Sequence, residues 1–149
     1  MPILNYTTTI DSEKTCREIQ KMLSKAGANA VMTEYDKDQV LSSIAFRLDL
    51  PGGPISFRLP ARIDNIYVIL QREADRPKYR TREQAARVAW RIIKDWIQAQ
   101  LALVEAEQVD MVEVFLPYAQ TAEGGTIYQR LTSGTGMPGV LPQLAPPEG

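Results

Sequence analysis

The stretch VLSSIAFRLDLPGGPISFRLP, Val40 to Pro60, decides the fold of this 149-residue chain. Apolar residues occupy every second position in both halves: Ile44, Phe46, Leu48, Ile55, Phe57 and Leu59. Such alternation is typical of strands that bury one face. Between the halves, Pro51-Gly52-Gly53-Pro54 is a strong turn signal. The stretch therefore predicts a β-hairpin whose outer face carries Arg47, Ser56 and Arg58.

Upstream of the hairpin, the sequence predicts two further strands separated by a helix. Residues Ile3 to Ile10 are rich in Thr and Tyr and read as a strand, and Ala30 to Tyr35 read as another. Asp11 or Ser12 can cap the helix between them. Cys16 falls on the apolar stripe of this helix, so we expect it to pack in the core rather than to act as a reactive thiol.

Downstream of the hairpin, the sequence predicts helices. Pro60 is expected to open one, because the first turn of a helix does not need the missing N–H. Thr81, with Gln84 three residues later, has the form of a capping box and predicts a long amphipathic helix from about residue 82 to about 107. Asp110 can cap a short helix through Phe115, whereas residues 126–131 fit either a short strand or a helical turn.

The predicted order β-α-β-β-β-α-α indicates an α+β fold, with an antiparallel sheet covered by helices and a long amphipathic C-terminal helix. We expect one domain over residues 1–131. From 132 to 149, eight of 18 residues are Gly or Pro, which predicts a flexible tail. The same tail could instead serve as a short extended docking peptide.

Composition excludes several chemistries. The chain has no histidine and one cysteine, which removes Ser-His-Asp and Cys-His catalysis, intrachain disulfides and the usual zinc sites. Neither a phosphate-binding glycine motif nor an apolar run long enough for a bilayer occurs, and no secretory signal is visible. We therefore expect a cytoplasmic, non-enzymatic protein with no cofactor, no metal and no membrane partner. A metal-dependent enzyme using carboxylates alone is the least favoured alternative.

One segment concentrates positive charge. Arg76 to Lys94, the basic segment, holds seven basic residues and one acidic residue, whereas the net charge of the chain is −1. At about 100° per residue, Arg87, Arg91 and Lys94 share a narrow stripe of the long helix. Tyr79 lies within the segment and could stack on a base. The candidate binding residues are Arg76, Lys78, Tyr79, Arg80, Arg82, Arg87, Arg91 and Lys94.

Two interpretations of the basic segment remain open at this stage. It can be a surface for nucleic acid or for an acidic protein, and basic residues at a helix start oppose the helix dipole, which favours such a role. Alternatively, it is the solvated side of a helix whose arginines pair with carboxylates elsewhere in the chain. From Asp95 to Glu123 there are six acidic residues and no basic ones, so this part of the chain is strongly polarised.

The chain also resembles a family of small uncharacterised proteins encoded by bacteriophages, prophages and other mobile elements. The likeness lies in ILNYTTTIDSEKTCREIQKML, MTEYD, a hairpin ending in FRLP, and a long helix containing VAWRIIKDW, over roughly residues 1–120. The resemblance implies a phage or prophage setting. It supplies no activity and no catalytic residues.

Together these observations predict a small non-enzymatic phage accessory protein that binds a macromolecule through a basic helix. Nucleic acid, in a role in DNA metabolism, is the first expectation. The alternative is a protein–protein inhibitor or adaptor that acts on a host or defence complex. The sequence leaves the oligomeric state open.

Overall fold

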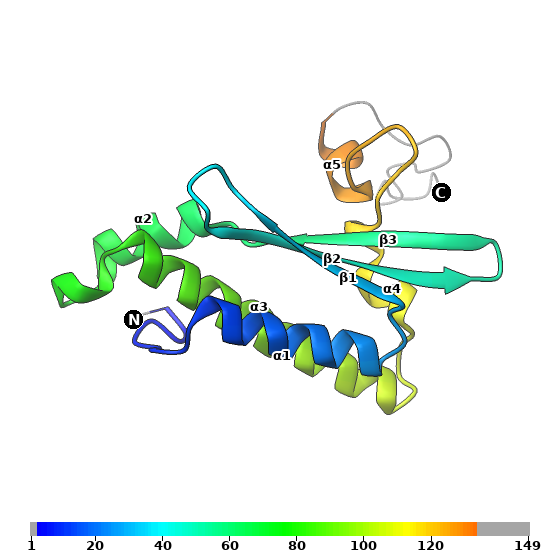
Figure 1. Cartoon of the computed structure of the whole chain (residues 1–149), viewed down its shortest axis with the longest axis horizontal. Helices are drawn as coiled ribbons and strands as arrows, with labels where there is room; N and C mark the ends of the chain where they lie inside the picture. The colour runs from blue at the N-terminus through cyan, green and yellow to red at the C-terminus, as the bar shows by residue number, and fades with distance from the viewer. Residues whose placement is uncertain (1–2, 134–149) are drawn as a thin grey trace, which may run out of the picture.

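The computed structural model describes residues 3–133, so the tail predicted for residues 132–149 lies outside the described residues from residue 134 onward. The described chain forms three strands, five α-helices and two 3₁₀ turns (Figure 1). In chain order these are α1 (Ser12–Lys25), β1 (Ala30–Tyr35), β2 (Leu41–Leu50), β3 (Gly53–Pro60), α2 (Ile63–Glu73), η1 (Pro77–Tyr79), α3 (Arg82–Glu105), α4 (Met111–Phe115), η2 (Leu116–Tyr118) and α5 (Ile127–Thr132).

The strands form one antiparallel sheet in the order β1-β2-β3, which confirms the α+β class and the hairpin. Phe46 on β2 lies opposite Val31 on one side and Phe57 on the other. The two phenylalanine rings stack, with centroids 5.0 Å apart. The apolar alternation of the hairpin therefore lines one face of the sheet, as its period of two requires.

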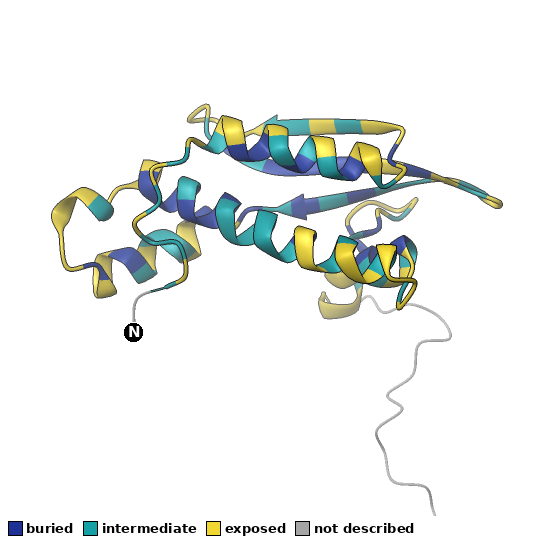
Figure 2. Ribbon diagram, turned by 90° about the horizontal axis from the view of Figure 1, so that it is seen from below, coloured by how far each residue is buried: buried dark blue, intermediate teal, exposed yellow. Residues whose placement is uncertain are grey.

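Helices α1 and α3 run side by side across this apolar face, and α5 lies on the opposite side of the sheet (Figure 1). Both helices turn buried residues inward and exposed residues outward (Figure 2). Trp90 of α3 is fully buried, and its Nε1–H donates to the backbone oxygen of Leu41 at 3.2 Å. Trp96, further along α3, is half-buried and packs edge-on against Phe115.

The strand predicted for Ile3 to Ile10 is wrong, so the sheet has three strands rather than four. Asn5 has a φ of 65°, a left-handed conformation that a strand does not contain. The Nε2 of Gln84 donates to the backbone oxygens of Tyr6 and Thr8, both at 2.9 Å. These contacts fix the segment as a turn against the start of α3, and they override the strand propensity of its threonines.

The role predicted for Pro60 is also wrong. Pro60 is the last residue of β3, opposite Ser43, and α2 begins only at Ile63. The N–H of Ala61 donates to the backbone oxygen of Ser42 at 2.9 Å, so the pairing of the two strands continues one residue further.

After α3 the chain continues through two more helices, so the long helix is not the C-terminal element. The expected Asp110 cap is confirmed as a complete capping box with Glu113. The ambiguity at residues 126–131 is resolved as helix α5, with a second capping box from Thr126. Between α4 and α5, Ala119 forms an antiparallel bridge with Phe57, which extends the sheet beyond β3. Within residues 3–133, no helix has both the length and the apolar character to cross a membrane.

Candidate binding surface

The first part of the basic segment forms the turn η1 and the start of α3. Arg76 and Lys78 are exposed there, and neither forms an ion pair within residues 3–133. Tyr79 is half-buried, because its ring packs edge-on against Tyr6 at 5.5 Å and Lys78 lies 5.0 Å from its centroid. The face of the ring that Lys78 covers is not free for a base.

The next two arginines of the basic segment are tied to the protein itself. Arg80 donates through Nε and Nη2 to the backbone oxygen of Ala74, at 2.9 and 2.6 Å, and so fixes the end of α2. Arg82 pairs with Asp64 near the start of α2, and this carboxylate raises the pKa of Arg82. Both guanidinium groups therefore hold α2 against the turn before α3.

The stripe of Arg87, Arg91 and Lys94 is half-buried rather than fully turned to the solvent, and Arg91 lies against α1. The Nη1 of Arg91 is 2.8 Å from Oε2 of Glu18 on α1, and only 15% of the Arg91 side chain is exposed. Arg87 pairs with Glu83 at 2.8 Å and also donates to the Oε1 of Gln84 at 3.2 Å. Both arginines therefore have carboxylate partners within the chain, as the second interpretation of the basic segment expected. Arg91 holds α3 to α1, whereas Arg87 bonds residues of α3 itself.

The last residue of the segment, Lys94, is half-buried and donates to the Oε1 of Gln98 at 2.9 Å. Gln98 lies on the same helix, and Lys94 has no carboxylate partner within residues 3–133. Within residues 3–133, four cations of the segment have no carboxylate partner: Arg76, Lys78, Arg80 and Lys94. Of these, Arg80 is held by the backbone oxygen of Ala74.

A second cationic surface, which sequence reasoning missed, lies on α1. Lys14, Arg17 and Lys21 are exposed and form no ion pair within residues 3–133. On a helix they fall within about 60° of one another, along about 10 Å of the axis. We call these three residues the α1 basic stripe.

Neither carboxylate of α1 forms an ion pair with this stripe. Glu18 is engaged by Arg91, and Glu13 accepts a hydrogen bond from the hydroxyl of Tyr35 at 3.1 Å. The spacing i, i+3, i+7 of the cations was visible in the sequence. It was overlooked because Glu18 lies among the three basic residues and Glu13 directly precedes them, so the segment has little net charge.

A shallow hollow of about 460 Å³ adjoins the stripe, lined by Arg17, Gln20, Lys21, Ser24 and Lys25. Gln20 and Ser24 bring an amide and a hydroxyl beside the cations. Amide and hydroxyl donors commonly accompany Lys and Arg where proteins contact phosphate. The arrangement can therefore bind an extended anion through charge and hydrogen bonds together.

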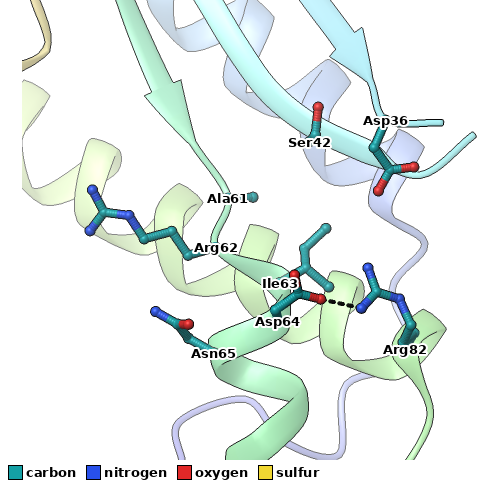
Figure 3. A pocket seen from close by; sticks show the side chains of 8 residues that line it. All are labelled: Asp36, Ser42, Ala61, Arg62, Ile63, Asp64, Asn65 and Arg82. Carbon is teal, nitrogen blue, oxygen red and sulfur yellow. Dashed lines mark hydrogen bonds and ion pairs between the residues drawn. The ribbon is translucent and has the colours of Figure 1, made fainter. Parts of the chain in front are cut away.

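A separate polar pocket of about 310 Å³ opens where β2 meets the start of α2 (Figure 3). Figure 3 shows Asp64 and Arg82 joined across it, with Arg62 directed away from that pair. Asp36 is already occupied, since its Oδ1 accepts from the N–H groups of Asp38 and Val40. Within residues 3–133, no three His, Cys, Asp or Glu side chains come together as metal ligands.

The expectation that Cys16 packs in the core is confirmed, since it is 2% exposed. Burial, helped by the nearby carboxylates of Glu13 and Asp11, raises the pKa of its thiol to about 12. The reactive thiolate is therefore scarce at neutral pH.

Comparisons of the chain with protein-family models, with curated proteins and with solved structures found no match.

Proposed function

We propose that this chain is a non-enzymatic accessory protein that binds the phosphate backbone of nucleic acid through the α1 basic stripe. The observation that supports this proposal is the separation of charge on α1. Lys14, Arg17 and Lys21 are exposed without ion pairs in residues 3–133, whereas Glu13 and Glu18 are engaged by neighbouring side chains. The phage or prophage setting rests on the sequence resemblance, whereas a role in DNA metabolism rests on the proposed contact with nucleic acid.

The geometry of the stripe favours contacts with phosphates. Successive cations lie three and four residues apart, or about 4.5–6 Å along the helix axis, which suits neighbouring phosphates of one strand. Contacts of this kind carry no sequence information and weaken steeply with salt. Three phosphate contacts give weak binding, which suits a protein that acts at many positions on its ligand.

The members of the basic segment are not equivalent under this proposal. Arg80, Arg82, Arg87 and Arg91 stabilise the fold. Arg76 and Lys78, exposed on η1 at one end of the molecule, remain candidates for a peripheral contact.

The test is a titration of fluorescently labelled duplex and single-stranded DNA at low salt, read as fluorescence anisotropy. The triple variant Lys14→Glu/Arg17→Glu/Lys21→Glu should lose binding. A control triple variant, Lys37→Glu/Arg76→Glu/Lys78→Glu, makes the same change in net charge at other exposed positions. It also removes the candidate peripheral contacts of Arg76 and Lys78, so it should lose only a small part of the binding. Circular dichroism of both variants should match that of the unaltered protein.

The outcomes separate the alternatives. If the control variant loses binding and the α1 variant keeps it, the site lies in the basic segment, as the sequence first predicted. If the unaltered protein binds neither form of DNA at low salt, the proposal is wrong. An acidic protein partner is then the function that the unpaired cations support.

A further inference from the structure

A groove runs between the C-terminal halves of α1 and α3, and the proposed function does not use it. It encloses about 590 Å³. Its apolar lining is contributed by both helices: Met22, Ala26, Leu101, Ala102 and Val104. Grooves of this character commonly dock another apolar surface.

The two walls of this α1–α3 groove carry opposite charges. Lys25 lies on the α1 wall and Glu105 on the α3 wall, and both side chains are exposed. They do not neutralise each other, and neither forms an ion pair with any other residue of the described chain. Each wall therefore presents an unpaired charge at the edge of an apolar surface.

We propose that a second copy of this chain docks on the α1–α3 groove around a two-fold axis. A two-fold interface is isologous: if one residue contacts another across it, the reciprocal contact also forms. A rotation that lays α1 of one copy over α3 of the other brings Lys25 of each copy to Glu105 of the other. The pattern of unlike charges on the two walls is therefore self-complementary.

The remaining features agree with the usual anatomy of an interface, in which an apolar centre is surrounded by a polar rim. Met22 is half-buried and flexible, and so can adjust to the facing surface. The three residues of the α1 basic stripe do not line the groove, but Lys25 lines both the groove and the hollow beside the stripe. The two proposals can still fail separately, because changes at Lys14, Arg17 and Lys21 test nucleic-acid binding and Glu105→Lys tests the dimer.

The charges predict the result of a swap experiment. Exposed ion pairs are individually weak, so the dimer should depend on concentration. Lys25→Glu or Glu105→Lys converts both symmetric attractions into repulsions, which should weaken the dimer about tenfold or more, equivalent to about 1.4 kcal/mol or more. The double variant Lys25→Glu/Glu105→Lys restores unlike charges across the axis and should recover the dimer.

The measurement is sedimentation velocity from micromolar to millimolar protein, with three controls. Lys37→Glu makes the same charge change on the exposed turn between β1 and β2 and should leave dimerisation unchanged. Ala102→Glu places a larger charged side chain at an exposed position of the groove and should give a monomer with unchanged circular dichroism. An equimolar mixture of the two single variants should form mixed dimers.

Three results would overturn the dimer: a monomer throughout this concentration range, a dimer unaffected by the single reversals or by Ala102→Glu, or a double variant no stronger than either single one. A monomer at all concentrations would indicate that the groove binds a helix from a different protein instead.

Discussion

Replacing Arg91 tests whether the most basic part of α3 is structural. The Arg91→Met variant keeps most of the apolar stem but removes the guanidinium that bonds Glu18 at 2.8 Å. The pair is neither fully exposed nor fully buried, since the two side chains are 15% and 35% exposed. Exposed pairs contribute about 0.2–1 kcal/mol, whereas breaking a buried pair costs about 3–5 kcal/mol.

The structure places the cost of breaking the Arg91–Glu18 pair between these two limits. Glu18 is accessible enough to regain water after the substitution, so the cost of an unpaired carboxylate is only partly felt. Hydrogen bonds to charged groups contribute about 1.5–3 kcal/mol, and we expect Arg91→Met to lower the free energy of unfolding by about 1.5 kcal/mol.

The assay is urea unfolding followed by tryptophan fluorescence, on Arg91→Met, Glu18→Gln and the double variant. We expect a coupling energy of about 1 kcal/mol between the two positions, with little change in the dependence of unfolding on urea. DNA affinity should be nearly unchanged in Arg91→Met. A coupling energy near zero, together with a large loss of DNA affinity, would show that Arg91 binds the ligand and would refute this reasoning.

Three further predictions concern the core and the sheet. Cys16 should resist alkylation in the native protein and react readily in urea, because burial raises the pKa of its thiol to about 12; rapid native labelling at neutral pH would contradict this. The pKa of Glu34 is lowered by hydrogen bonds from Arg58 and Ser43, so its carboxylate adds stability above its ordinary pKa of 4.5, and that stability is lost as the pH falls through the lower folded-state value. Glu34→Gln should therefore reduce the free energy of unfolding at pH 7 by less than about 1 kcal/mol, because the Glu34–Arg58 pair is more than a third exposed. The difference should vanish in acid, and an equal cost in acid would contradict an origin in the Glu34 carboxylate. Trp90→Phe should cost about 2 kcal/mol in urea unfolding, because it removes the hydrogen bond to the backbone of Leu41 and leaves space in the core; a neutral effect would place Trp90 outside the core.

The parts of the fold that sequence could predict are those set by local chemistry. The alternation from Ile44 to Leu59 and the turn between predicted the hairpin, because a period of two fixes which face is buried. The caps at Thr81 and Asp110 could also be predicted, because each side chain bonds the backbone of its own first turn. Gln84 shows where prediction from a local sequence motif fails. It completes the motif of a capping box, yet its amide leaves its own helix and binds the backbone of Tyr6 and Thr8.

The candidate site was harder to predict from the sequence, because the exposure of a charged side chain depends on partners that are distant in sequence. Arg91 meets Glu18 across 73 positions, and Arg82 meets Asp64 across 18. A helical wheel gives the direction of a side chain but not what lies in that direction. The contact that engages Arg91 also engages Glu18, so this carboxylate does not pair with the α1 basic stripe.

The most direct test of the central claim is the salt dependence of DNA binding by the unaltered protein and by Lys21→Gln. For three phosphate contacts on a duplex, the slope of log K against log salt concentration should be about −3, and removing Lys21 should reduce its magnitude by about 1. A slope near zero, or one that Lys21→Gln leaves unchanged, would show that the α1 basic stripe does not contact phosphates.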